Sequence, residues 1–138
     1  MFRQGPIPAF VHGVFEYVVG IFLVAAPFLL GYDADAAIAA SIVAGVIVLI
    51  IAASTAMSTG LIRSIPVQAH VVLDYLLAIA LIAAPFLFGF TDDGSATAVF
   101  VALGVLHLLM TIATRFVRDE RPPRRRGRPP AEPADQPR

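Results

Sequence analysis

Four long apolar stretches constrain this chain more than any other feature of its sequence. A helix needs about 20 apolar residues to cross a hydrocarbon layer of ~30 Å. Four stretches are that long and hold at most one charged residue each: 5–32, 36–62, 64–91 and 94–114. Only 14% of the residues are charged, against roughly 25% in soluble domains, so a soluble domain is excluded. We predict an all-α polytopic membrane protein with four transmembrane helices near 8–30, 37–57, 66–89 and 95–116.

The positions of the charged residues predict the orientation of the chain in the membrane. All ten basic residues are arginines, and they lie before the first predicted helix (Arg3), between the second and third (Arg63), and from Arg115 onward. The two other connections carry no basic residue and four acidic ones, namely Asp33, Asp35, Asp92 and Asp93. Because basic residues collect on the cytoplasmic face, we predict a multi-pass protein of the cell membrane with both ends of the sequence in the cytoplasm.

The first and third predicted helices are copies of one sequence. Residues 7–31 and 65–89 align without gaps, and 13 of the 25 positions are identical. The shared pattern contains His-x-x-x-acid-Tyr and, further along, Ala-Ala-Pro-Phe-Leu-x-Gly. Because each unit crosses the membrane twice, both copies have the same orientation. We therefore predict two tandem helical hairpins, with repeat units of about 7–57 and 65–116, in one transmembrane domain over 1–118.

The proline motif of each copy has a structural explanation. A proline in the last turn bends the helix, and a glycine four residues later suits a left-handed helix end. We expect these structural roles for the repeated motif residues Pro27, Phe28, Gly31, Pro85, Phe86 and Gly89. In the second predicted helix, Ala37, Ser41 and Gly45 form a stripe of small residues, which lets a neighbouring helix approach closely.

This duplicated pattern resembles the SPW-repeat family of small integral membrane proteins. That family is named for a Ser-Pro-Trp motif near the end of the first helix of a two-helix unit. The corresponding triplets here are Ala26-Pro27-Phe28 and Ala84-Pro85-Phe86, so the proline is retained while Ser and Trp are replaced. The resemblance covers residues 7–55 and 65–113. It implies a membrane fold built from such units, and it implies no assigned reaction.

Five ionisable side chains lie inside the predicted membrane segments: His12, Glu16, His70, Asp74 and His107. His12 and Glu16 are four residues apart, as are His70 and Asp74, so each pair shares one helix face. The rise of ~1.5 Å per residue places both acids at the depth of His107, with the other two histidines one turn closer to the interface. We expect the two acids and His107 to meet in one layer of the bundle.

Three interpretations of these five residues stay open. In the first, they form hydrogen bonds that fix the helix packing, together with Tyr17 and Tyr75, at a gain on the order of 1 kcal/mol per contact. In the second, they relay protons or cations, because chains of such residues mark ion pathways. In the third, they hold zinc, iron or manganese, for which imidazole and carboxylate are suitable ligands. Nothing in the sequence selects a metal, so we predict neither a metal nor another cofactor.

The sequence predicts no enzyme. It has no cysteine, no HExxH zinc motif and no glycine-rich phosphate loop, and Ser54, Thr55 and Ser58 lie at an ordinary helix end. The leading hypothesis is a non-enzymatic structural or interaction role in the cell membrane, with a proton or cation carrier as the alternative. The two hypotheses differ in one feature: the carrier requires the two acids and His107 to converge on a water-filled interior. If the protein encloses a pathway, its small size favours a homo-oligomer, and a monomer stays open as the alternative.

Beyond residue 118 the composition changes to arginine and proline. Residues 119–138 have too few apolar side chains for a packed core, so we predict a disordered cytoplasmic tail. Its plainest role is to anchor the topology, and the sharper alternative is contact with anionic lipid headgroups, at ~1 kcal/mol per basic residue. No aromatic residue follows Phe116 to stack on bases, so we predict no nucleic-acid partner.

Overall fold

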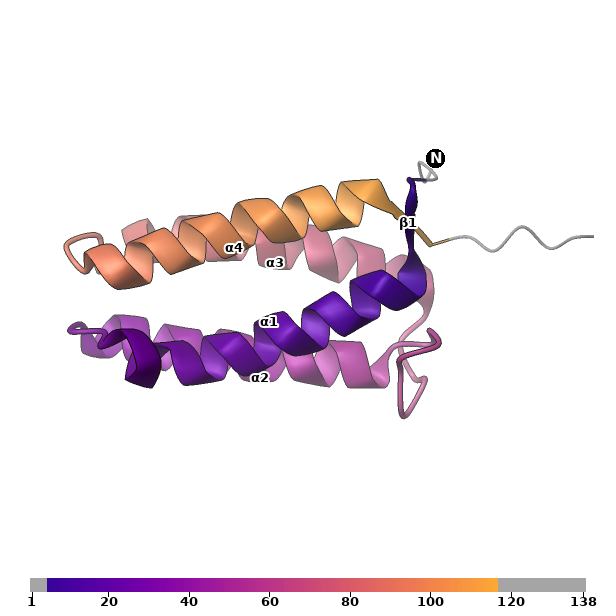
Figure 1. Cartoon of the computed structure of the whole chain (residues 1–138), viewed down its shortest axis with the longest axis horizontal. Helices are drawn as coiled ribbons and strands as arrows, with labels where there is room; N and C mark the ends of the chain where they lie inside the picture. The colour runs from indigo at the N-terminus through magenta and orange to yellow at the C-terminus, as the bar shows by residue number, and fades with distance from the viewer. Residues whose placement is uncertain (1–4, 117–138) are drawn as a thin grey trace, which may run out of the picture.

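Two helical hairpins, each made of two antiparallel helices, form the part of the protein that the computed structural model describes, residues 5–116 (Figure 1). Helix α1 (Ala9–Leu30) packs along α2 (Asp35–Ser54), and α3 (Val67–Leu87) packs along α4 (Gly94–Ala113). All four helices are long and apolar enough to cross a membrane. The predicted all-α fold of two tandem hairpins is confirmed.

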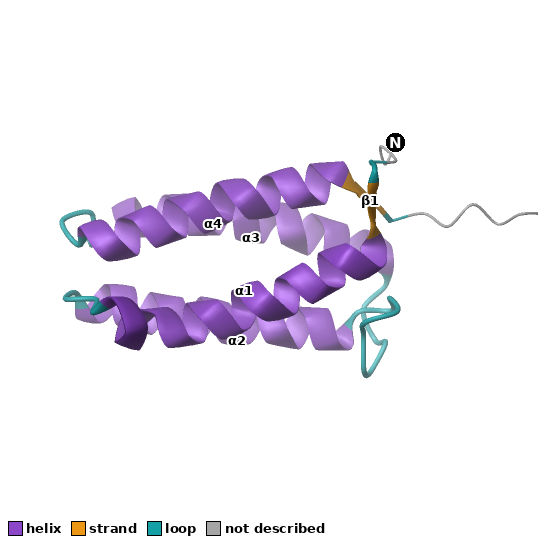
Figure 2. Ribbon diagram, in the orientation of Figure 1, coloured by secondary structure: helices purple, strands orange, loops and turns teal. Residues whose placement is uncertain are grey.

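The two ends of the bundle carry different segments (Figure 2). The turn end holds the tight connections 31–34 and 88–93. The terminal end holds the longer connection 55–66 and two short strands, β1 (Ile7–Pro8) and β2 (Thr114–Arg115), which pair in parallel.

Backbone pairing at the terminal end ties the two hairpins together. Strand β1, just before α1, pairs Ile7 with Thr114, just after α4. A matching isolated bridge joins Thr55, just after α2, to Ile65, before α3. Both threonines have an extended backbone. Because of this, α2 and α4 each end at the residue before the threonine. Both helices therefore stop three residues short of their predicted ends at 57 and 116.

The second helices of the two hairpins correspond at a different sequence offset from the first helices. Residues of α1 match those of α3 at an offset of 58, whereas the buried residues of α2 match those of α4 at an offset of 59. Gly45 then corresponds to Gly104, and Thr55 to Thr114. The additional residue lies between Gly89 and the start of α4. With this shift, the pairing Ile7–Thr114 is the counterpart of the bridge between residues 65 and 55.

Small residues let the two helices of each hairpin approach closely. A Cβ atom at Gly45 would lie 2.7 Å from the carbonyl oxygen of Gly20, and one at Gly104 would lie 3.0 Å from that of Ala78. Ser41 is buried on the same face of α2 and donates its hydroxyl to a carbonyl oxygen of α1 at 2.6 Å. The predicted stripe of small residues therefore packs against α1.

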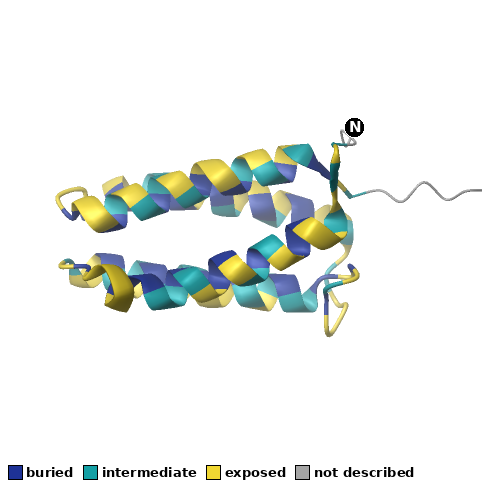
Figure 3. Cartoon of the chain, viewed as in Figure 1, coloured by how far each residue is buried: buried dark blue, intermediate teal, exposed yellow. Residues whose placement is uncertain are grey.

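Apolar side chains cover the outside of the bundle, where exposed surface alternates with buried surface along each helix (Figure 3). The two phenylalanines of the repeated motif, Phe28 and Phe86, face outward and are 75% and 67% exposed, whereas the motif prolines are buried. The motif glycines, Gly31 and Gly89, have φ angles of 63° and 68°, which is the left-handed conformation that glycine favours. The chain is thus a multi-pass membrane protein whose outer faces contact lipid.

The core lies between the hairpins and is apolar over the half of the bundle nearer the turn end. Its largest members there are Leu23, Leu81, Phe90 and Phe100. The predicted tail, 119–138, and the predicted domain boundary at 118 fall outside the described residues.

Candidate functional site

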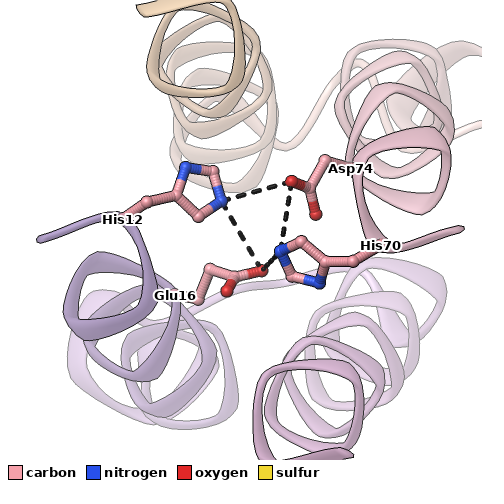
Figure 4. A group of neighbouring side chains, drawn as sticks. All are labelled: His12, Glu16, His70 and Asp74. Atoms are coloured by element: carbon pink, nitrogen blue, oxygen red, sulfur yellow. Dashed lines mark ion pairs between the residues drawn. The ribbon is translucent and has the colours of Figure 1, made fainter. Parts of the chain in front are cut away.

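Four ionisable side chains meet in the half of the bundle nearer the terminal end, and we call them the central cluster: His12 and Glu16 from α1, and His70 and Asp74 from α3 (Figure 4). Each residue contributes one ring nitrogen or carboxylate oxygen, and these four atoms lie within 4.8 Å of one another. Asp74 Oδ2 is 3.2 Å from His12 Nε2 and 3.3 Å from His70 Nε2. Glu16 Oε1 is 3.5 Å from His70 Nε2 and 3.9 Å from His12 Nε2. All four residues are at most 1% exposed.

The fifth predicted residue, His107, contacts the cluster from α4. Its Nε2 atom lies 3.7 Å from Asp74 Oδ1, the oxygen that does not face the other two histidines. At the offset of 59, the residue of α2 that corresponds to His107 is Val48. Glu16 therefore has an apolar residue where Asp74 has a histidine. The structure brings together all five predicted residues, and the side chains of His12 and His70 reach the layer of the acids.

Two threonines hold the histidines of the central cluster in place, each from the opposite hairpin. His12 Nδ1 lies 3.0 Å from the hydroxyl of Thr114, and His70 Nδ1 lies 2.9 Å from that of Thr55. Each hydroxyl also lies 2.6 Å from the carbonyl oxygen four residues earlier in its own helix. A hydroxyl has one proton to donate, and that carbonyl takes it. The histidine Nδ1–H therefore donates to the threonine oxygen.

This donation determines what the histidines present to the carboxylates. With the proton on Nδ1, the Nε2 atom of a neutral imidazole is an acceptor. Five atoms of the cluster have no hydrogen-bond partner within residues 5–116. They are the Nε2 atoms of His12 and His70, the two oxygens of Asp74, and Oε2 of Glu16. When the imidazoles are neutral and the carboxylates ionised, acceptor atoms of both kinds therefore face one another with no donor between them among the described residues.

The cluster also concentrates negative charge. It contains two carboxylates, and the arginines among the described residues, Arg63 and Arg115, are exposed at the surface. The chain has no lysine. Inside the described bundle, positive charge at the cluster would have to come from its histidines or from a bound cation. Such a set of nitrogen and oxygen donors can hold a cation between the two hairpins.

Apolar groups close the cluster on both sides. The half-buried ring of Phe116 lies edge-on to His12 and His70, at centroid distances of 5.1 and 6.1 Å on the side of the terminal end. Toward the turn end the next buried side chain of α1 is Val19. The tyrosines of the packing interpretation lie elsewhere: the Tyr17 hydroxyl donates to a backbone carbonyl in the 55–66 connection, and Tyr75 is exposed.

The sequence interpretation missed Thr55 and Thr114, which orient the two histidines. The sequence alone places Thr55 at an ordinary helix end. The signal that marks both residues is a threonine after each second helix, repeated at an offset of 59. An alignment that keeps the offset of 58 places these threonines out of register.

Comparisons with known proteins identify the family of the chain. Neither a search of curated proteins nor a search of solved structures found a match. The family description "SPW repeat domain" matches residues 10–114, a span that includes all five ionisable residues and both threonines. Since this match covers most of the chain, the protein belongs to the SPW-repeat family, as its proline motif had predicted.

Proposed function

We propose that this chain is a non-enzymatic membrane protein that binds a cation between its two hairpins. One observation carries the proposal: two buried carboxylates, one from each hairpin, lie within 4.8 Å of each other with acceptor nitrogens beside them. Two negative charges at that separation repel by roughly 3 to 4 kcal/mol at an effective dielectric constant of ~20. Each buried ion also loses several kcal/mol of hydration. A cation at the centre offsets both penalties.

The unpartnered atoms favour cation binding over a purely packing role. Polar groups that only fix helix packing are normally hydrogen-bonded, because a buried group without a partner costs about 1–3 kcal/mol. The central cluster instead leaves both oxygens of Asp74, Oε2 of Glu16 and the two Nε2 atoms without hydrogen bonds among the described residues. A bound cation would satisfy these atoms and join α1 to α3. The structural role of the leading hypothesis then follows from cation binding.

The apolar half of the bundle supports binding from one side rather than transport across the membrane. Between the cluster and the turn end, the core consists of side chains such as Val19, Leu23 and Leu81. Two hydroxyl groups are buried in that half: that of Ser41 is already bonded to a carbonyl oxygen, and that of Tyr32 lies at the turn end. We therefore propose that the cation enters from the terminal end, past the half-buried ring of Phe116. A single chain supplies every group of the cluster, so the proposal requires no second copy.

The arginine distribution supports placing the terminal end in the cytoplasm of the cell. Arg63 and Arg115 lie at that end, and eight of the ten arginines lie from residue 115 onward. We propose that those beyond the described residues contact anionic lipid headgroups on the same side.

Thermal unfolding of the purified full chain in lipid nanodiscs tests the proposal. The protein is stripped with a chelator, and its unfolding temperature is measured with sodium, potassium, magnesium, calcium, manganese or zinc added singly. At least one cation should raise the temperature, because a ligand at 100 times its Kd stabilises by about 2.7 kcal/mol. The double variant Glu16→Gln/Asp74→Asn should lose this response, and the exposed control Asp92→Asn should keep it. An unfolding temperature that no cation changes would contradict the proposal.

A further inference from the structure

We infer that the cation is one divalent first-row transition-metal ion bound by four side-chain atoms: Nε2 of His12, Nε2 of His70, Oε1 of Glu16 and Oδ2 of Asp74. His107 then acts as a positioning residue for Asp74. This inference rests on the proposed function and specifies the ion and its ligands. The distances, the orientation of the histidines, the charge and the asymmetry of the cluster each support it.

The distances between the donor atoms fit a four-coordinate ion. Bonds of about 2.1 Å in a tetrahedral arrangement place the ligand atoms ~3.4 Å from one another. The four nitrogen–oxygen separations in the cluster run from 3.2 to 3.9 Å, on both sides of that value. The two carboxylate oxygens, and likewise the two histidine nitrogens, lie within 4.8 Å of each other, so the four side chains would close in around the ion. Each of the two carboxylate oxygens lies beside the Nε2 atoms of both histidines, so oxygen and nitrogen alternate around one centre (Figure 4).

The threonine contacts have the form of an outer shell around a metal. A histidine that binds a metal through one ring nitrogen usually donates its other N–H to a fixed acceptor, which sets the orientation of the ring. His12 and His70 donate from Nδ1 to Thr114 and Thr55 and turn Nε2 toward the centre. Because each threonine belongs to the opposite hairpin, the orientation of both rings requires the two hairpins to dock correctly.

Charge and ligand chemistry select the class of ion. Two carboxylates and two neutral imidazoles carry a charge of minus two, which a divalent ion neutralises in a surrounding of low dielectric constant. Magnesium and calcium prefer sites made only of oxygen atoms. Mixed imidazole and carboxylate ligands suit zinc, iron and manganese. The cluster therefore favours a transition metal over an alkali or alkaline-earth ion.

The difference between the surroundings of Asp74 and those of Glu16 indicates the role of His107. Its Nε2 atom approaches Oδ1 of Asp74, while Oδ2 faces the centre. At 3.7 Å this contact is longer than a hydrogen bond. If it shortens when the ion binds, a hydrogen bond from His107 would hold the carboxylate in the orientation that binds the ion. Glu16 has Val48 in the corresponding place and lacks this support. We expect Asp74 to be the better-oriented of the two carboxylate ligands.

Metal titration of the full chain in nanodiscs tests the inference. Chelator-treated protein is titrated with cobalt(II) and zinc(II), and binding is followed by the visible absorption of cobalt and by metal content after desalting. We expect one ion per chain and a cobalt spectrum typical of a four-coordinate site. Glu16→Gln and Asp74→Asn should abolish that spectrum, whereas Asp92→Asn should leave it unchanged.

Variants outside the ligand set separate positioning from folding. Thr114→Val should weaken cobalt affinity by about 10- to 100-fold, the usual effect of removing an outer-shell partner, and Thr114→Ser should restore it. His107→Val, which copies the residue at Val48, should weaken affinity to a similar extent and shift the cobalt absorption band. Circular dichroism confirms that each variant is helical. A threonine that acts only in packing would change stability and leave the spectrum as it is.

The possible results distinguish a failure of the metal inference from a failure of the proposed cation binding. If sodium, magnesium or calcium stabilises the protein and cobalt and zinc do not bind, the metal inference is wrong and cation binding stands. If cobalt binds equally well to wild type and to the Glu16→Gln and Asp74→Asn variants, the ion lies elsewhere and the inference is also wrong. If no cation binds at all, both the inference and the proposed function are wrong.

Discussion

The turn end offers a sharp test of how the hairpins are held together, because one carboxylate serves both of them. Asp93 is 8% exposed and precedes α4. Its Oδ1 accepts the backbone N–H of Ala96 at 3.0 Å and so caps its own helix. Its Oδ2 accepts the backbone N–H groups of Asp33 and Ala34, at 2.8 and 3.1 Å, from the turn of the other hairpin. We predict that Asp93→Ala loosens this end of the bundle.

The size of the effect follows from the three hydrogen bonds. Loss of a helix N-cap costs about 1 kcal/mol. Bonds to a charged acceptor contribute about 1.5–3 kcal/mol when buried, and we take ~1 kcal/mol for each of the two cross-hairpin bonds, because water at the surface partly replaces them. Asp93→Ala should therefore destabilise the protein by about 3 kcal/mol. Asp92→Ala, which removes an exposed carboxylate from the adjacent position, should change stability by less than about 0.5 kcal/mol.

The same bonds make the effect depend on pH. Desolvation tends to raise the pKa of Asp93, but backbone N–H groups of Ala96, Ala34, Asp33 and Ser95 outweigh it and hold the pKa below its usual value. A lowered folded-state pKa stabilises the protein above the unfolded value of about 3.9. The contribution is lost as the pH falls through the folded-state pKa. The stability gap between wild type and Asp93→Ala should therefore be full at pH 7 and narrow below about pH 4.

Unfolding of the two variants in mixed dodecylmaltoside and SDS micelles, followed by circular dichroism, measures these differences. The free energy of unfolding is compared at pH 7 and at successively lower pH values. Equal stabilities for Asp93→Ala and Asp92→Ala would refute the docking role of Asp93. A gap that stays constant down to the most acidic pH would refute the assignment to its carboxylate.

Three other perturbations test the packing and the direction of access. Gly104→Leu should lower stability by about 1–3 kcal/mol through overpacking, because a Cβ there already lies 3.0 Å from the carbonyl oxygen of Ala78; unchanged SDS unfolding would contradict the close approach. Ser41→Ala should lower stability by about 1 kcal/mol through loss of its 2.6 Å bond to α1, with the exposed Ser95→Ala as control; equal effects would remove the role of that bond. Proteoliposomes with wild-type protein should show no proton flux above empty liposomes, and a flux that the double carboxylate variant abolishes would restore the transport hypothesis.

Local sequence patterns predict the parts of this fold that depend on one helix or one hairpin. Apolar length predicts the four helices, and the spacing of four residues places His12 beside Glu16 and His70 beside Asp74 on shared faces. The depth of His107 is predictable for the same reason, because the rise of a helix is regular. Each of these predictions uses distances along one helix.

Apart from the meeting of the two acids with His107, the contacts between the hairpins could not be predicted from the sequence, because they depend on how the hairpins dock. Four aspartates lie at the turn end, and their local sequences do not distinguish Asp93, which is buried and bonded to the other turn, from the exposed Asp92. The role of Thr55 and Thr114 depends on which hairpin faces which histidine. One additional residue before α4 also hides the correspondence of these threonines from the alignment of the first helices.

Duplication within one chain explains how the central cluster combines symmetric and asymmetric features. Neither hairpin completes the cluster alone, because each histidine is held by a threonine of the other hairpin, and each carboxylate faces histidines from both. Two identical chains related by a two-fold axis would place the same residue at both equivalent positions. They would carry either two histidines or two valines where this chain has His107 and Val48. A duplicated chain can place a histidine beside Asp74 alone, so the two carboxylates no longer have to act identically.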